Sequence, residues 1–156
     1  MRVDLKDRVV IVTGGGGAIG GAMAEAFAEN GAKVVVAGRT IKTLEAVVET
    51  IKAKGGEASA VIADVSDRDS AANMVAETVK LYGRLDVLVN NAGINGGPDQ
   101  RKPIHEYSDE LWERITNVDL NGVYYCSKPA IQQMEKQGQG GNIINIGSIV
   151  GLAPLR

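Results

Sequence analysis

Glycine residues follow a short apolar run near the start of the chain, in a pattern suited to binding phosphate. Residues 9–13 are Val-Val-Ile-Val-Thr and residues 14–20 are Gly-Gly-Gly-Gly-Ala-Ile-Gly. Apolar residues then recur at helical spacing, at Ile19, Ala22, Met23, Ala26 and Phe27. Glycine lets the backbone turn tightly and approach an anion, and the first turn of a helix offers it unpaired N–H groups. A strand, a glycine-rich turn and a helix in this order predict a site for the pyrophosphate of a dinucleotide.

Arg39 follows the next apolar run, Lys-Val-Val-Val-Ala-Gly at residues 33–38. In dinucleotide-binding folds an acidic residue near this position bonds the 2′-hydroxyl of the adenosine ribose, whereas an arginine accommodates a 2′-phosphate. Arg39 therefore favours NADP(H) over NAD(H), without support from a second basic residue in the glycine-rich turn. The alternative is a solvated arginine at the end of a strand.

Polar side chains also follow the third and fourth apolar runs. Asp64 can accept a hydrogen bond from the adenine amino group, or it can help to cap the helix expected after Ser66. The sequence leaves both roles open. Asn90-Asn91-Ala92-Gly93 closes the fourth run. Its two amides can tie neighbouring strands together and face a ligand crevice, and we expect the structural tie from Asn90.

The elements that must position these residues alternate between strand and helix. Near-continuous apolar runs predict parallel strands, buried on both faces, at residues 9–13, 33–38, 58–63, 85–90 and 142–147. Strand and helix units in series predict an α/β fold, a doubly wound parallel sheet of the Rossmann type. In such a fold the ligand lies at the carboxyl ends of the strands.

Helical periodicity fills the segments between the later strands. One helix is expected from Thr40 to the glycines at residues 55–56. The next follows Ser66, which with Asp69 resembles a capping box, and ends near residue 83. A long helix is expected over residues 108–137, with a kink or break at Pro129.

Length and composition limit the possible functions. The 156 residues contain no linker or repeat and predict one dinucleotide-binding domain over residues 1–156. A net charge of −2 gives no reason to expect a nucleic-acid partner. Cys126 is the single cysteine of the chain. The sequence has no apolar run of membrane-spanning length and no signal-peptide core. We therefore expect a cytoplasmic protein without a membrane partner. His105 has no second His or Cys at metal-ligand spacing, so no metal site is expected.

Four motifs, taken together and in this order, resemble the short-chain dehydrogenase/reductase family over the whole chain. They are Thr13-Gly14-x-x-x-Ala18-x-Gly20, Asp64-Val65, Asn90-Asn91-Ala92-Gly93 and Gly147-Ser148, with Ala18 in place of one family glycine. The resemblance implies adenine contacts from Asp64 and Val65, and a cofactor groove lined by Asn91, Ala92 and Gly93. It implies pyrophosphate contacts from Thr13, Gly14, Gly16, Gly17, Ile19 and Gly20.

The same resemblance implies an NAD(P)(H)-dependent oxidoreductase acting on a small-molecule carbonyl or alcohol. Ser148 would be the catalytic serine that hydrogen-bonds the substrate oxygen. A ketoacyl thioester and a sugar or polyol both stay open as substrates, and a homo-oligomer is implied.

The chain departs from the family pattern at two places. Asp119, in Val118-Asp119-Leu120-Asn121-Gly122, occupies the place of a catalytic asparagine. Its backbone carbonyl can still order a proton-relay water, while its carboxylate adds negative charge beside that relay. The family's acid/base pair, a tyrosine followed four residues later by a lysine, lies after the serine, and residues 149–156 contain neither. We therefore expect the N-terminal part of a longer protein, truncated before this pair and incomplete on the C-terminal side of the fold. The fifth strand would otherwise be an exposed apolar edge.

The sequence also offers an alternative acid/base pair and three alternative functions. Tyr124 and Lys128 match Tyr-x-x-x-Lys literally, but they precede Ser148 and lie in the long helix, where we expect Tyr124 to pack. A methyltransferase usually carries an acidic residue where Arg39 stands, and no Gly-Lys-Ser/Thr closes the glycine run as in a phosphate-loop nucleotidase. A half-fold that binds cofactor without turnover stays open as the alternative to an enzyme.

Overall fold

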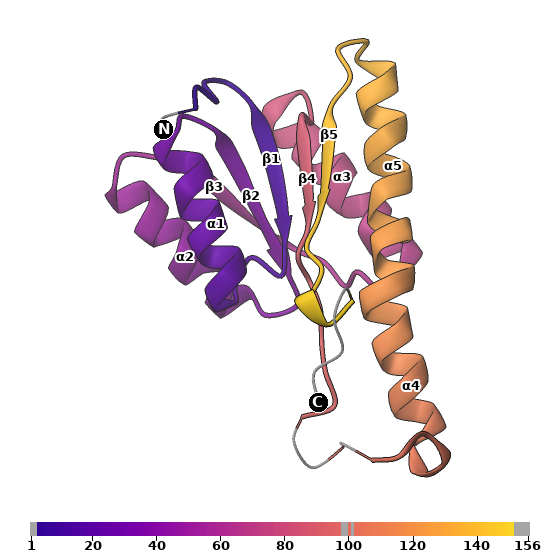
Figure 1. Cartoon of the computed structure of the whole chain (residues 1–156). Coiled ribbons are helices and arrows are strands. Elements are labelled where there is room, and N and C mark those ends of the chain that lie inside the picture. The colour runs from indigo at the N-terminus through magenta and orange to yellow at the C-terminus, as the bar shows by residue number, and fades with distance from the viewer. Residues whose placement is uncertain (1–2, 98–99, 101, 152–156) are drawn as a thin grey trace.

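The computed structural model describes residues 3–97, 100 and 102–151, and its centre is a five-stranded parallel sheet (Figure 1). The strands are β1 (Val9–Thr13), β2 (Lys33–Gly38), β3 (Glu57–Ile62), β4 (Val87–Asn90) and β5 (Asn142–Asn145). Their order is β3-β2-β1-β4-β5, so the chain winds outward from β1 to β3 and then crosses back to β4. The predicted doubly wound fold is confirmed, with its switch point between β1 and β4.

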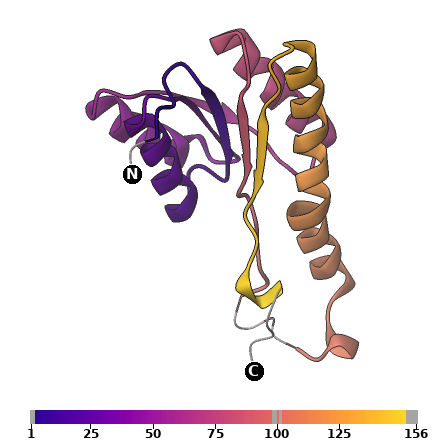
Figure 2. The same cartoon turned by 45° about the horizontal axis from the view of Figure 1, so that its top comes forward.

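Helices cover both faces of the sheet (Figure 2). One face packs against α1 (Ala18–Glu29) and α2 (Ile41–Ala53) through a core that includes Val34, Leu44 and Ile51. The other face packs against α3 (Arg68–Tyr82) and α5 (Gly122–Lys136) through a second core that includes Met74 and Leu88. Before α5 come the short 3₁₀ helix Ile104–Glu106, α4 (Asp109–Thr116) and a π-helical segment, Asn117–Asn121. No helix of the described residues is long and apolar enough to span a bilayer.

The buried face of α1 differs in part from the expected one. Its buried residues are Gly20, Gly21, Ala24 and Ala28, whereas the side chain of Ile19 is 66% exposed. Glycine and alanine on the sheet-facing side let the helix backbone approach the strands closely, and Met23 and Phe27 pack, partly buried, against the same core. The predicted helix is therefore present, and of its larger apolar residues Met23 and Phe27 face the core whereas Ile19 does not.

Two helix details also correct the sequence analysis. Asp67, not Ser66, is the N-cap of α3, because its carboxylate accepts a hydrogen bond from the N–H of Ser70 at 2.6 Å. The other end of α3 is as predicted, since Gly83 ends it with φ 79°. α5 continues across Pro129, and the irregular part of the long helix is instead the π-helical segment, Asn117–Asn121.

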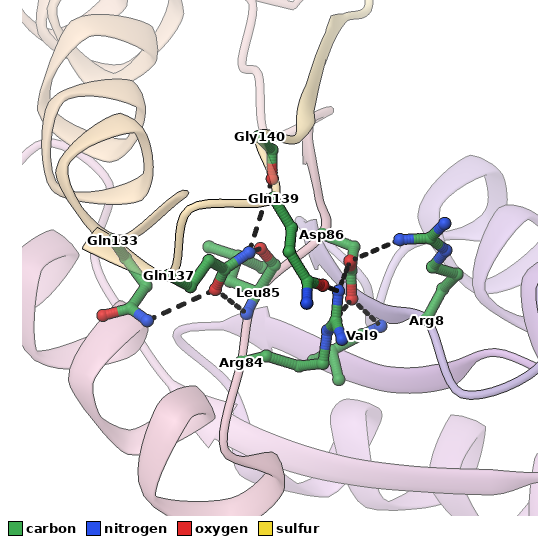
Figure 3. Close-up of polar contacts among 9 residues, drawn as sticks. All are labelled: Arg8, Val9, Arg84, Leu85, Asp86, Gln133, Gln137, Gln139 and Gly140. Atoms are coloured by element: carbon green, nitrogen blue, oxygen red, sulfur yellow. Dashed lines mark hydrogen bonds and ion pairs between the residues drawn. The ribbon is translucent and has the colours of Figure 1, made fainter. Parts of the chain in front are cut away.

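A polar cluster fastens the amino ends of β1 and β4 (Figure 3). The buried carboxylate of Asp86 accepts hydrogen bonds from Arg8 Nη1 at 3.0 Å, the N–H of Val9 at 2.9 Å and Arg84 Nε at 2.8 Å. Burial raises the pKa of Asp86, but the bonds from Arg84, Val9 and Arg8 outweigh it, so the pKa lies below its usual value. This cluster belongs to the fold, because ligands of such sheets lie at the opposite edge.

The same region explains why β4 is shorter than predicted. The side-chain amide of Gln137 pairs with the backbone of Leu85, accepting from its N–H at 3.1 Å and donating to its carbonyl at 2.6 Å. β4 therefore begins at Val87, two residues later than expected. β5 ends at Asn145, although the N–H of Ile146 still donates to Asn90 O at 3.0 Å.

Candidate functional site

The parallel sheet brings the carboxyl ends of all five strands to one edge. Arg39 follows β2, the glycine-rich turn follows β1 and residues 91–94 follow β4. Asp64 comes shortly after β3, and Ser148 shortly after β5, just before the 3₁₀ helix Ile149–Gly151. The topology thus gathers the predicted cofactor residues and the predicted catalytic serine along one edge of the sheet.

The glycine-rich turn folds back on the start of α1. Gly14 has φ +64°, a left-handed conformation that favours glycine, and the N–H of Gly17 donates to its carbonyl at 3.1 Å. A Cβ atom on Gly20 would meet Gly14 O and would lie 2.8 Å from Asn91 Nδ2. Turn and helix therefore approach each other more closely than an alanine allows, which forms a backbone cradle at this end of α1.

The N-terminus of α1 is free of side-chain caps. Its N-cap, Gly17, offers no side chain, and its first turn has no acidic residue. By contrast, Asp67 and Ser108 accept hydrogen bonds from backbone N–H groups at the starts of α3 and α4. α2 also lacks a side-chain cap, but it does not follow the glycine cradle. The first N–H groups and the positive dipole end of α1 thus fit an anionic group.

Thr13 and Asn91 connect the ends of β1 and β4. The buried hydroxyl of Thr13 accepts hydrogen bonds from the N–H groups of Asn91 and Ala92, each at 3.0 Å, and donates to Val89 O at 3.2 Å. Asn91 Nδ2 donates to Thr13 O at 2.9 Å. The polar groups of these two side chains already bond to the protein. Their role is therefore to hold the strand ends that form the crevice in place.

Asn90 makes a second tie, as the sequence led us to expect. Its Nδ2 donates to Asn145 Oδ1 at 2.9 Å and to Ser127 Oγ at 3.1 Å. This small network fastens β4 to β5 and to α5, just before Ser148 in the chain.

A cavity of about 140 Å³ lies at the sheet edge between the ends of β2, β3 and β4. Six of the predicted cofactor residues line it: Gly14, Arg39, Asp64, Val65, Ala92 and Gly93. Thr13, Gly16, Gly17, Ile19, Gly20 and Asn91 do not line this cavity, and Gly16 and Gly17 border a separate groove between α1 and α2. Sequence reasoning missed four lining residues that adjoin predicted ones in the chain or follow the same strand: Gly38, Ala63, Ile94 and Val118.

Asp64 and Arg39 form the charged end of this cavity. Asp64 Oδ1 accepts hydrogen bonds from the Ser66 hydroxyl at 2.6 Å and the Ser66 N–H at 2.9 Å. The Ser66 hydroxyl, helped by the charge of Arg39, holds the pKa of Asp64 below its usual value against the effect of burial. Asp67 performs the capping that was the alternative role for Asp64. Among the described residues, no hydrogen bond or ion pair engages the Arg39 guanidinium, and Arg39 is exposed at the cavity.

Asp119 lies within the π-helical segment and contacts the loop after β4. Its Oδ1 accepts a hydrogen bond from the N–H of Ile94 at 2.9 Å. Its carboxylate lies 3.7 to 3.9 Å from the position that a Cβ atom of Gly93 would occupy. The Asp119 carboxylate therefore lies next to the crevice wall formed by Gly93 and Ile94. Ser148 lies beyond the end of β5, and its carbonyl accepts from the N–H of Gly151 at 3.0 Å.

Tyr124 does not pack as expected. Its side chain is 56% exposed, and its ring contacts Tyr125 edge-on with centroids 6.0 Å apart. The ammonium of Lys128 lies 6.0 Å from the same ring. Tyr125 is the aromatic residue of this helix that packs against the core. Neither Tyr124 nor Lys128 lines the cavity described above.

A family model described as short chain dehydrogenase matches residues 8–156. An uncharacterized oxidoreductase of Thermotoga maritima is 44% identical over 144 residues, which are 92% of this chain and 54% of that protein. The 3beta-hydroxysteroid dehydrogenase 2 of Eggerthella lenta is 36% identical over 148 residues, which are 95% of this chain and 56% of that protein.

Solved structures show the same likeness. The crystal structure of a short-chain type dehydrogenase/reductase from Mycobacterium marinum superposes with a TM-score of 0.92 at 32% identity, covering 97% of this chain and 60% of that one. The chain spans about half the length of the curated relatives it matches, 54% and 56% for the two named above. Sequence, fold and the arrangement of the sheet edge agree, and the chain belongs to the short-chain dehydrogenase/reductase family.

Proposed function

We propose that the protein is an NAD(P)(H)-dependent oxidoreductase that transfers hydride between nicotinamide and a small-molecule carbonyl or alcohol. One observation carries the proposal. A single cavity at the carboxyl edge of the sheet is lined by Gly14, Arg39, Asp64 and Gly93, and Ser148 follows β5 at the same edge. The names of the relatives, dehydrogenases and reductases among them, support the same class of reaction.

The chemistry of the crevice fits such a cofactor. The uncapped start of α1 and the backbone cradle formed by Gly14 and Gly20 suit a pyrophosphate. We assign phosphate contacts to the turn at residues 13–20, with Thr13 supporting it from behind. Asp64 and Val65 would contact adenine, and the strand end at residues 91–93 would line the groove. The bound nicotinamide would accept or donate the hydride.

We further propose that NADP(H) binds more tightly than NAD(H). Arg39 follows β2, where the 2′-substituent of the adenosine ribose is bound in such folds. Among the described residues no hydrogen bond or ion pair engages its guanidinium, which can form charge-assisted, bidentate hydrogen bonds to a phosphate.

For the chemical step, we assign Ser148 to the substrate oxygen. A hydroxyl there donates a hydrogen bond as negative charge develops on that oxygen. The backbone carbonyl of Asp119 would hold a proton-relay water. Ketoacyl thioesters and sugars or polyols are the substrate classes we would test first. We also propose a homo-oligomeric assembly and a cytoplasmic location. The second fits the single Cys126, a buried thiol whose pKa burial raises to about 12.

Calorimetric titration of the purified protein with NADP⁺ and with NAD⁺ tests the proposal. We expect both to bind, NADP⁺ more tightly, and absence of binding of either would overturn it. Nicotinamide absorbance, followed with NADPH and a panel of carbonyl compounds, tests the chemical step separately. Binding without turnover of any of them would favour the cofactor-binding half-fold.

A further inference from the structure

The proposed cofactor can bind along this sheet edge in one orientation only. Arg39 and Asp64, after β2 and β3, take the adenosine end, and the turn after β1 takes the pyrophosphate. With the strand order β3-β2-β1-β4-β5, the rest of the molecule must extend past β1 toward β4 and β5. The nicotinamide half therefore belongs on the side of the loop that contains Gly93 and Ile94.

Asp119 places a negative charge behind that loop. Its Oδ1 bonds the N–H of Ile94 at 2.9 Å, and the carboxylate lies beside Gly93, where no side chain intervenes. Within the described part of the chain Asp119 takes part in no ion pair. One backbone N–H is thus its only described partner, and its charge is not cancelled by a neighbouring cation.

The two redox forms of the cofactor differ at this end. The oxidised nicotinamide ring carries a positive charge and the reduced ring carries none, whereas adenosine, pyrophosphate and 2′-phosphate are common to both. A carboxylate near the ring attracts only the oxidised form. We infer that Asp119 is a specificity-determining residue that favours the oxidised cofactor over the reduced one. The inference rests on the proposed function. Because Asp119 is exposed and solvent screens its charge, the preference should be several-fold rather than many orders of magnitude.

Asp119→Asn isolates the charge, because the amide oxygen can still accept from the Ile94 N–H. Dissociation constants for NADP⁺ and NADPH are measured by calorimetry for the unsubstituted protein and the variant. We expect the ratio of the NADP⁺ constant to the NADPH constant to rise about three- to tenfold in the variant. Contacts to the phosphates and adenosine cancel in this ratio. Protection of the Ile94 amide from hydrogen exchange should persist in Asp119→Asn and fall in Asp119→Ala.

Glu135→Gln is the matched control. It removes an exposed carboxylate from the far end of the same helix, about 24 Å away along the axis, and should leave the ratio unchanged. Raising the salt concentration should weaken the preference of the unsubstituted protein for NADP⁺ over NADPH. This test needs no variant. If both forms bind, but the ratio is unchanged in Asp119→Asn or the preference does not respond to salt, the inference about Asp119 is overturned and the proposed function is not. Failure of the unsubstituted protein to bind either form would overturn the proposed function as well.

Discussion

Asn91 and Thr13 are joined twice, since Asn91 Nδ2 donates to Thr13 O at 2.9 Å and the Asn91 N–H donates to the Thr13 hydroxyl at 3.0 Å. Thr13 ends β1 and Asn91 directly follows β4, and these are the strands on either side of the switch point. The crevice at the edge of a doubly wound sheet opens there. The pair therefore fixes the position of the glycine-rich turn relative to the groove wall at residues 92–94.

Replacing Thr13 by Val should destabilise the protein. The hydroxyl accepts from two backbone N–H groups, those of Asn91 and Ala92, and valine leaves both without an acceptor in a buried place. We expect the free energy of unfolding to fall by about 1–3 kcal/mol, measured by urea denaturation. Thr13→Ser keeps the hydroxyl and should retain most of the stability. Equal losses in the two variants would show that the hydroxyl does not hold the strand ends together.

Asp86 should make stability depend on acid. Burial raises its pKa, but the bonds from Arg84, Val9 and Arg8 prevail, so the folded-state pKa is below the unfolded one. A carboxylate of this kind stabilises the fold fully above its unfolded pKa of about 3.9 and loses that contribution as the pH falls through the folded value.

Asp86→Asn should therefore lower the free energy of unfolding at neutral pH by about 3 kcal/mol. It should also flatten the decline in stability below about pH 4. Urea denaturation across this range gives both quantities. Glu135→Gln, which removes an exposed carboxylate, serves as the control. If the free energy of unfolding of Asp86→Asn falls just as steeply with decreasing pH, other carboxylates cause the loss of stability in acid.

The fold was largely predictable because its signals are local. β1 and β2 were predicted with their observed bounds, since runs such as Val9–Thr13 are buried along their whole length. The start of β4 was not, because Gln137, 52 positions away in the sequence, bonds the backbone of Leu85. β5 ends at Asn145, two residues before its predicted end. The π-helical segment was missed because a 3.6-residue periodicity has no signal for one widened turn.

The candidate site was predictable only in part. Glycine spacing and strand ends located Gly14, Arg39, Asp64 and Gly93, and the structure brings all of them to one cavity. The sequence could not tell that Thr13 and Asn91 bond each other, or that Ile19 lies exposed in the first turn of α1. Those outcomes depend on which side of each element faces the sheet, and tertiary packing decides that.

Arg39→Asp should reverse the cofactor preference. It removes the guanidinium that would pair with the 2′-phosphate and introduces a carboxylate suited to the 2′-hydroxyl. We expect NADP⁺ affinity to fall about 10- to 100-fold while NAD⁺ affinity holds or improves, measured by calorimetry. Arg114→Met, an exposed arginine of α4, is the control and should change neither affinity. Equal affinities for the two cofactors in the unsubstituted protein would contradict the role assigned to Arg39.

Ser148→Ala and Tyr124→Phe should separate the two candidate catalytic positions in any preparation that turns over a carbonyl substrate. Loss of the Ser148 hydroxyl should lower turnover by about two to three orders of magnitude with little change in cofactor affinity. Tyr124→Phe keeps an exposed ring in place and should retain nearly all activity. Abolished turnover in a stably folded Tyr124→Phe protein would make Tyr124 the acid/base.

The central claim is that a dinucleotide binds along the carboxyl edge of the sheet. Amide chemical shifts of the isotope-labelled protein, recorded during titration with NADP⁺, test it most directly. We expect the largest shifts in the turn at residues 14–20, at Arg39 and Asp64, and at residues 92–94. Shifts confined to the larger, open cavity of about 840 Å³ that includes Lys102, Tyr107 and Ile115, or no shifts at saturating NADP⁺, would contradict the account.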